Sequence, residues 1–231
     1  MVPELDAVLF DLGGTLDGRG GWRDRFHRHF TECGLGDAFA FERRARAFDY
    51  AEEQSHQSAD LSRAGLRDLV RLHLGWQLAS LGAPDCDAAA TIVERFARDV
   101  DAACAVSRRV LSALVDEGYT LGVVSNGCGN VAALCEEYGF AGLLSVIVDS
   151  HVFGRAKPDP AIFVHALSQI GADPARTAFV GDSLDRDIEP AKALGLRTFW
   201  LVDGCRTVAP AVDVALEQIA DLPAHLRQAV R

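Results

Sequence analysis

The stretch AVLFDLGGTL, residues 7–16, sets the expectation for the fold. Four apolar residues in a row are typical of a strand that is buried on both faces of a parallel sheet. Asp11 ends this run, and Gly13 and Gly14 follow it closely. Because aspartate and glycine both favour turns, we expect a tight turn that carries a carboxylate at the end of a buried strand.

Similar apolar runs recur in the second half of the chain, and helical patterns separate them. The expected strands cover residues 5–10, 119–125, 143–149, 177–182 and 197–202. The intervening segments have apolar residues at helical spacing, and each helical pattern is followed by a glycine: Gly118, Gly139 and Gly171. Glycine at that place is typical of a helix C-terminus. Strands that alternate with helices predict an α/β fold with a doubly wound, Rossmann-like parallel sheet.

Residues 19–106 interrupt this alternation. They contain no convincing strand pattern, and helical stripes follow one another, with Ser62 and Asp87 as expected helix N-caps. We therefore expect an all-helical domain over residues 19–106, inserted into a core that consists of residues 1–18 and 107–231.

The composition narrows the classes of function. The chain has 231 residues and a net charge of −10, which argues against a general binder of nucleic acid or of anionic membranes. No apolar run approaches the roughly 18 residues of a membrane span. Six cysteines are scattered without a C-x-x-C pair, so we expect reduced thiols in a cytoplasmic protein. We also expect a monomer or homodimer that acts on a small molecule.

Polar residues follow several of the expected strands. Each has an ordinary structural explanation as a turn residue, a helix cap or a solvated loop residue. Ligands of open α/β sheets, however, bind at the carboxyl ends of the strands, where these residues would meet. The set comprises Asp11, Ser125, Asn126, Gly127, Lys157, Asp182 and Asp187. Carboxylates, a hydroxyl and an amine at one edge fit phosphoryl transfer through an aspartyl intermediate, with Mg²⁺ between the carboxylates and the phosphate.

Four segments resemble, in order, the four motifs of the haloacid dehalogenase superfamily: FDLGGTL, VVSNG, KPDPAIF and VGDSLDRDIEPAKALG. The helical insertion resembles that family's C1-type cap. The resemblance implies that Asp11 is the nucleophile, that Ser125 binds phosphate and that Lys157 bridges the two. It also implies a metal site made by Asp11, the Gly13 carbonyl and Asp182, with Asp187 ordering the waters of the metal. The remaining implied phosphate-binding or turn residues are Gly14, Thr15, Asn126 and Gly127.

Position 13 departs from the phosphatase form of the first motif, in which an aspartate acts as general acid and base. Glycine keeps the metal-binding carbonyl and removes the proton donor, which is typically worth about 10²–10⁴ in rate. We first expect a Mg²⁺-dependent phosphohydrolase of a small phosphorylated metabolite, either with a leaving group that needs little protonation or with an acid from the cap. The candidates for that acid are Asp17, His27, His29 and His56.

Two alternatives stay open. The first is a hydrolase of the 2-haloacid dehalogenase type, which needs no alcohol protonated, although that branch works without metal and matches VGDSLDRD poorly. The second is a non-catalytic binding or regulatory protein on the same fold. A phosphonatase would need a lysine in the cap, and residues 17–106 contain none.

Overall fold

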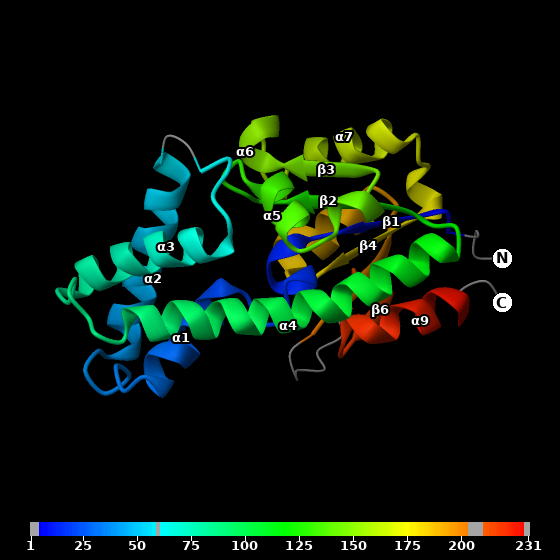
Figure 1. Ribbon diagram of the computed structural model, residues 1–231. Coiled ribbons are helices and arrows are strands. Elements are labelled where there is room, and N and C mark those ends of the chain that lie inside the picture. The colour runs from blue at the N-terminus through cyan, green and yellow to red at the C-terminus, as the bar shows by residue number, and fades with distance from the viewer. Residues whose placement is uncertain (1–4, 59–60, 203–209, 229–231) are drawn as a thin grey trace.

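The computed structural model describes residues 5–58, 61–202 and 210–228, and a parallel sheet lies at its centre (Figure 1). The strands are β1 (Ala7–Phe10), β2 (Thr120–Ser125), β3 (Val146–Asp149), β4 (Thr177–Gly181), β5 (Arg197–Leu201) and β6 (Val214–Leu216). They pair in the order β3-β2-β1-β4-β5-β6, and every pairing is parallel. The predicted doubly wound α/β fold is therefore confirmed.

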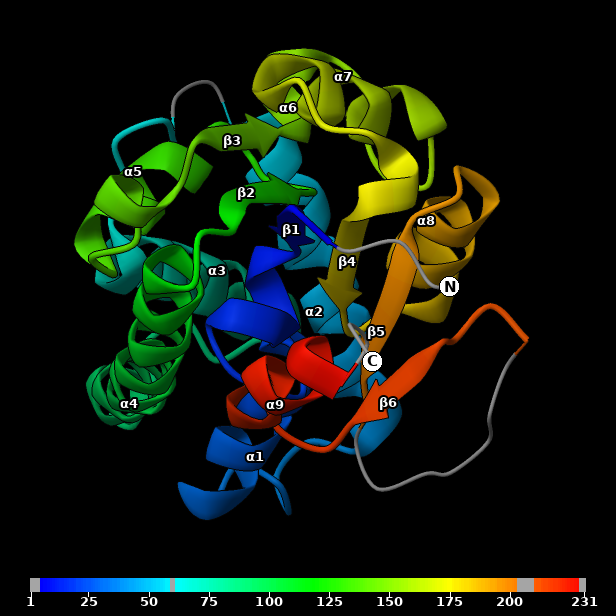
Figure 2. The same cartoon turned by 90° about the vertical axis from the view of Figure 1, so that its right-hand side faces the viewer.

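Helices cover both faces of the sheet, which explains why the strand sequences are continuously apolar. The helices of the second half are α5 (Val131–Glu137), α6 (Ser150–Phe153), α7 (Pro160–Ile170), α8 (Glu189–Ala193) and α9 (Leu222–Gln228). Figure 2 shows α5 and α9 on one face and α7 and α8 on the other. Side chains alternate between the faces. Val8 and Phe10 of β1 belong to one buried core, and Leu9 packs with Phe163 and Phe179 in the other.

Most predicted element boundaries agree with the structure to within a few residues. Gly118, Gly139 and Gly171 have φ values of 90°, 71° and 64°, the left-handed conformation expected after a helix. The predicted strand 143–149 begins late, because residues 141–143 form the short helical turn η2 (Ala141–Leu143). The sixth strand was not predicted from the sequence, since it has three residues and only its last is buried.

The expected helical insertion contains three helices and the beginning of a fourth. They are α1 (Trp22–Glu32), α2 (Phe41–Gln57), α3 (Leu66–Leu81) and α4 (Ala89–Asp116). The predicted N-caps were wrong, because Gly65 precedes α3 and Ala88 precedes α4. The predicted boundary between residues 106 and 107 falls inside α4, which continues from the other insert helices alongside the sheet and α9 (Figure 1). We keep the term insert for residues 19–106, and the domain division stays a prediction.

The topology brings the ends of the central strands together. β1 has β2 on one side and β4 on the other, so the loops after β1 and β4 separate at a switch point of the sheet. No helix of the described residues is long and apolar enough to cross a membrane. Five cysteines are free thiols, and Cys205 lies outside the described residues.

Candidate active site

The turn after β1 has type II geometry. Gly13 has φ −75° and ψ 119°, and Gly14 has φ 85° and ψ −7°. A type II turn needs a positive φ at its third residue, which here is Gly14. A Cβ added to Gly14 would also lie 2.2 Å from Oδ2 of Asp182. The turn therefore requires glycine at position 14. It does not require glycine at position 13, where an added Cβ would have no heavy atom within 4 Å.

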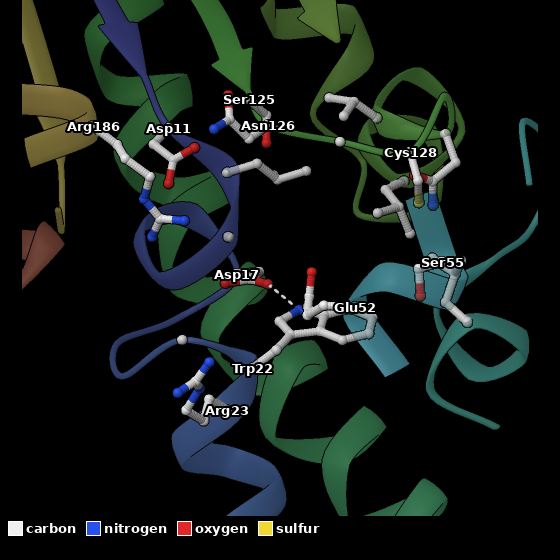
Figure 3. Close-up of a pocket in the computed structure, with 18 of the residues that line it drawn as sticks. Asp11, Asp17, Trp22, Arg23, Glu52, Ser55, Ser125, Asn126, Cys128 and Arg186 are labelled. Carbon is white, nitrogen blue, oxygen red and sulfur yellow. Dashed lines mark hydrogen bonds between the residues drawn. The ribbon is translucent and has the colours of Figure 1, made fainter. Parts of the chain in front are cut away.

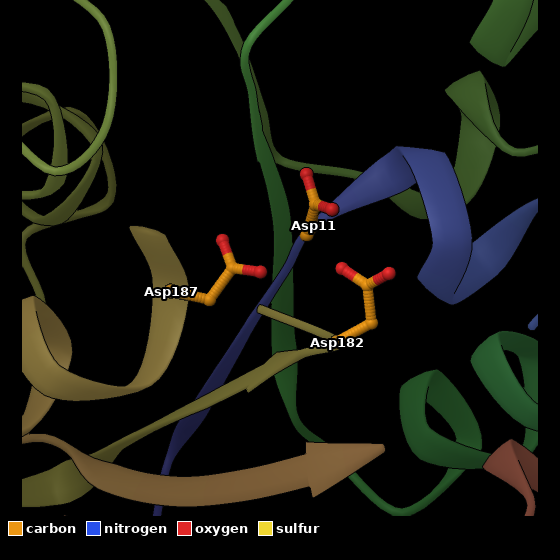
Figure 4. Close-up of side chains that lie close together, drawn as sticks. All are labelled: Asp11, Asp182 and Asp187. Atoms are coloured by element: carbon orange, nitrogen blue, oxygen red, sulfur yellow. The ribbon is translucent and has the colours of Figure 1, made fainter. Parts of the chain in front are cut away.

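Three carboxylates meet beside this turn (Figure 4). Asp11 follows β1, Asp182 follows β4, and Asp187 comes from the helical turn η4 (Leu184–Ile188). Each offers an oxygen, and these oxygens lie within 4.8 Å of one another. The close approach depends on Gly181, because a Cβ there would lie 2.5 Å from the Cβ of Asp187.

Lys157 joins two of these carboxylates. Its Nζ donates to Oδ1 of Asp11 at 2.7 Å and to Oδ1 of Asp187 at 2.6 Å, and the side chain is 2% exposed. The Asn126 side chain fixes the lysine backbone from both sides: Nδ2 donates to the Lys157 carbonyl at 2.9 Å, and Oδ1 accepts from the Lys157 amide at 2.7 Å. The amide side chain of Asn126 therefore positions the lysine.

The local electrostatics favour a bound cation. Burial raises the pKa of Asp11 to about 7, because the opposing effect of Lys157 is partly cancelled by Asp187 and Asp182. Burial and then Asp187 raise the pKa of Asp182 to about 6. Burial alone would lower the pKa of Lys157, but Asp11 and Asp187 reverse this and hold it above its ordinary value.

Oδ1 of Asp182 is buried and has no hydrogen-bond partner among the described residues. Buried polar atoms are normally satisfied, so this oxygen is available to a ligand. Carboxylate and carbonyl oxygens are also the donors that hard divalent cations prefer. The residues present thus fit a divalent metal ion.

The loop after β2 forms the other side of the centre. Ser125 ends that strand, and Gly127 has no room for a Cβ, which would lie 2.4 Å from Cγ2 of Val131. Asp149, at the end of β3, fixes the loop by accepting hydrogen bonds from the amides of Gly129 and Val131 at 2.9 and 3.1 Å, and it caps α6 by accepting from the amide of His151 at 2.8 Å. This role was not predicted, because an aspartate after a strand gives no indication of the loop that it contacts.

A cavity of about 490 Å³ lies between this centre and the insert (Figure 3). The predicted site residues that line it are Asp11, Gly13, Ser125, Asn126, Gly127, Lys157, Asp182 and Asp187. Gly14 and Thr15 do not line it, and the Thr15 hydroxyl is buried without a hydrogen-bond partner among the described residues. The insert helices contribute Trp22, Arg23, Phe48, Glu52, Ser55, His56, Leu69 and His73. Glu52, Ser55 and His73 were not predicted as cavity residues, since the first two lie on α2, which has few apolar residues, and His73 lies among the apolar residues of α3.

Of the candidate acids, Asp17 and His56 line the cavity and His27 and His29 do not. Asp17 is already engaged as an acceptor. Its Oδ1 accepts from the Gly14 amide at 2.7 Å, its Oδ2 accepts from Trp22 Nε1 at 3.1 Å, and Arg25 lies at 3.5 Å. These contacts tie the turn after β1 to the first helix of the insert.

Comparison with known proteins gives consistent results. The family model for haloacid dehalogenase-like hydrolases matches residues 5–195. Haloacid dehalogenase-like hydrolase domain-containing protein 3 of Bos taurus is 30% identical over 208 residues, which cover 84% of this chain and 82% of that protein. N-acetylmuramic acid 6-phosphate phosphatase of Pseudomonas aeruginosa is 30% identical over 203 residues, with coverages of 84% and 80%. A dehalogenase crystal structure aligns with a TM-score of 0.66 at 20% identity, covering 97% of this chain and 98% of that one, a likeness of fold alone.

Proposed function

Because the chain belongs to the haloacid dehalogenase-like hydrolase family, we propose that it is a Mg²⁺-dependent phosphohydrolase that acts on a small phosphorylated metabolite. The observation that carries this proposal is the group of Asp11, Asp182 and Asp187, of which Asp11 and Asp187 are buried, with Lys157 bonded between these two. A phosphatase among the relatives that align over most of the chain supports it. We propose further that the insert is the cap of this hydrolase.

The metal would be held by Asp11, Asp182 and the carbonyl of Gly13, and Asp187 would order its waters. When bound, Mg²⁺ offsets the charge between these carboxylates and the phosphoryl oxygens. Family members generally use a divalent metal, and the unpartnered Oδ1 of Asp182 supports its presence here.

Asp11 would attack phosphorus as the nucleophile. The new acyl-phosphate bond forms as the bond to the leaving oxygen breaks, and water then hydrolyses the aspartyl phosphate. Lys157 holds Oδ1 of Asp11 at 2.7 Å and so fixes the carboxylate for attack. Ser125 and the main-chain amides of Asn126 and Gly127 would hold phosphoryl oxygens and stabilise the developing charge. Gly13 supplies no proton, so the leaving group either has low basicity, such as an acyl or aryl oxygen, or receives a proton from an acid of the insert, where His56 lines the cavity.

A 2-haloacid dehalogenase reaction is the second candidate, and the missing carboxylate at position 13 favours it. The same nucleophile would displace halide from carbon, with no alcohol to protonate. A binding protein without catalysis is disfavoured, because such a protein gains nothing from burying Asp11, Asp187 and Lys157 beside a third carboxylate at a cost in stability.

The test compares p-nitrophenyl phosphate and 2-chloroacetate as substrates, each with Mg²⁺ and with a chelator. We expect release of nitrophenol that requires Mg²⁺ and that Asp11→Asn abolishes, whereas Asp116→Asn, an exposed control, retains it. Chelator-resistant release of chloride that is lost in Asp11→Asn would favour the dehalogenase. Full nitrophenol release by Asp11→Asn would refute the nucleophile.

A further inference from the structure

The insert helices contribute a single carboxylate to the described lining of the cavity, that of Glu52 in α2. Figure 3 shows Glu52 on the insert side, facing the region that Asp11 approaches from the core. The side chain is 43% exposed, and it lines the cavity. A substrate whose phosphate lies at Asp11 would therefore extend its leaving group toward Glu52.

Two histidines flank this carboxylate. Nε2 of His73 lies 3.4 Å from Oε1 of Glu52, and Nε2 of His56 lies 3.7 Å from Oε2. The His73 ring is 2% exposed and stacks on Phe26, with centroids 5.0 Å apart and planes 13° apart. Its position is therefore fixed by packing in the insert.

The tautomer of His73 follows from its other nitrogen. Nδ1 lies 2.9 Å from Nε2 of Gln77 and accepts from it, which places the ring proton on Nε2, toward Glu52. That Nε2 is buried and makes no hydrogen bond among the described residues. This unpaired N–H group at the cavity wall can donate a hydrogen bond to an acceptor, either a slightly shifted Glu52 or an oxygen of a ligand.

The charge at this wall selects among leaving groups. Glu52 is an acceptor, and its pKa lies below the usual range: burial alone would raise it, but His73, His56 and Arg186 together outweigh burial. The surrounding wall is apolar at Phe48 and Leu69. Arg23 and Arg186 also line the cavity. At Glu52 itself, an ionised acceptor attracts hydroxyl and ammonium donors and repels a second anion.

We propose that Glu52 is a specificity-determining residue that binds hydroxyl groups of a polyhydroxylated leaving group, so that the site prefers sugar phosphates to phosphates that carry a carboxylate. This inference rests on the proposed phosphohydrolase function. It assigns to His73 the role of a positioning residue for Glu52.

The matched probes are glucose 6-phosphate and 6-phosphogluconate, which share a carbon skeleton and differ by a carboxylate. We expect wild-type kcat/KM to be at least about tenfold higher for the sugar phosphate, since a charge-assisted hydrogen bond contributes about 1.5–3 kcal/mol. Glu52→Gln should bring the ratio close to one, mainly through KM, because the contact is the same in the ground and transition states. Glu52→Lys should invert the preference, a gain that misfolding does not produce.

The control is Glu53→Gln, which alters the neighbouring glutamate of α2, bonded to Gln57 and outside the cavity lining. Its ratio should equal that of wild type. Hydrolysis of p-nitrophenyl phosphate by wild type with Mg²⁺ tests the phosphohydrolase function separately from the role of Glu52. If wild type hydrolyses the aryl phosphate but neither of the two matched probes, or if the ratios of wild type, Glu52→Gln and Glu52→Lys agree, the role of Glu52 is refuted alone. If wild type hydrolyses none of the three phosphates, the proposed function and this inference fail together.

Discussion

Gly13→Asp restores to the turn after β1 the carboxylic acid that could donate a proton to the leaving group. The backbone at this position, with φ −75° and ψ 119°, suits any residue, and an added Cβ meets no heavy atom within 4 Å. Losing glycine flexibility in the unfolded chain contributes about 0.4–1 kcal/mol of stability. A further carboxylate near Asp11 and Asp182 opposes this gain. We therefore expect a melting temperature within about 4 °C of wild type, the shift that ~1 kcal/mol produces in a chain of this size.

The effect on turnover depends on the leaving group. An alkoxide must be protonated as it departs, whereas nitrophenolate departs unprotonated. A positioned general acid typically raises the rate by a factor of about 10²–10⁴. An aspartate whose pKa the surrounding site has not adjusted should give the lower factor, about 10². We expect Gly13→Asp to raise kcat/KM for glycerol phosphate by that factor and for p-nitrophenyl phosphate by less than about tenfold, measured as Mg²⁺-dependent release of inorganic phosphate.

The matched control is Gly13→Asn, which adds nearly the same volume without a transferable proton. If the asparagine variant gains as much as the aspartate variant, the gain comes from packing or turn rigidity. If neither changes the ratio of alkyl to aryl turnover, the site already has a proton donor, and the reasoning about position 13 is wrong.

In the presence of a chelator, Asp182→Asn should raise the free energy of unfolding near pH 8 by about 1–2 kcal/mol. The full shift of the Asp182 pKa from 3.8 to about 6 is worth ~3 kcal/mol, and the partial exposure of the side chain reduces this value. Urea denaturation should show this gain vanishing as the pH falls from about 6 to 3.8, because Asp182 of the folded wild type becomes protonated there and its destabilising charge is lost. A gain that is constant with pH would contradict the raised pKa. Calorimetry should show Mg²⁺ affinity falling between about pH 7 and pH 6, where Asp11 and Asp182 take up protons, and an affinity unchanged down to about pH 5 would refute these shifts. Asp149→Ala removes the acceptor of three main-chain amides, so it should lower the free energy of unfolding by about 1–3 kcal/mol and weaken inhibition by inorganic phosphate. Asp149→Asn is the milder control. Equal phosphate inhibition in wild type and Asp149→Ala would refute this role.

Local sequence patterns predicted the sheet and the central residues of the site. A strand such as β1 is apolar on both faces because helices cover both, and that property is visible in four consecutive residues. Asp11 and Asp182 directly follow short buried strands, so knowing the fold class was enough to bring them together. Lys157 follows a mostly exposed segment, and the KPDPAIF motif was needed to recognise it.

The wall of the cavity could not be predicted in the same way. Glu52 and His73 lie on different helices, and their proximity depends on how α2 packs on α3. The helix α2 lies in the segment that was expected to be helical, but it has no continuous apolar stripe, because its buried face includes Arg44 and two alanines. Asp149 illustrates the same limit, since its contacts with Gly129 and Val131 join segments that sequence spacing does not relate.

The central position of β1 determines when the protein can complete its site during synthesis. The strand leaves the ribosome first, yet its neighbours begin at Thr120 and Thr177. The helices of the insert make contacts between nearby residues and are synthesised before either neighbour. Lys157 lies 146 positions after the Asp11 carboxylate that it contacts. Such long-range pairings form late in folding, so a nascent chain that ends before β4 holds the nucleophile but has no active centre.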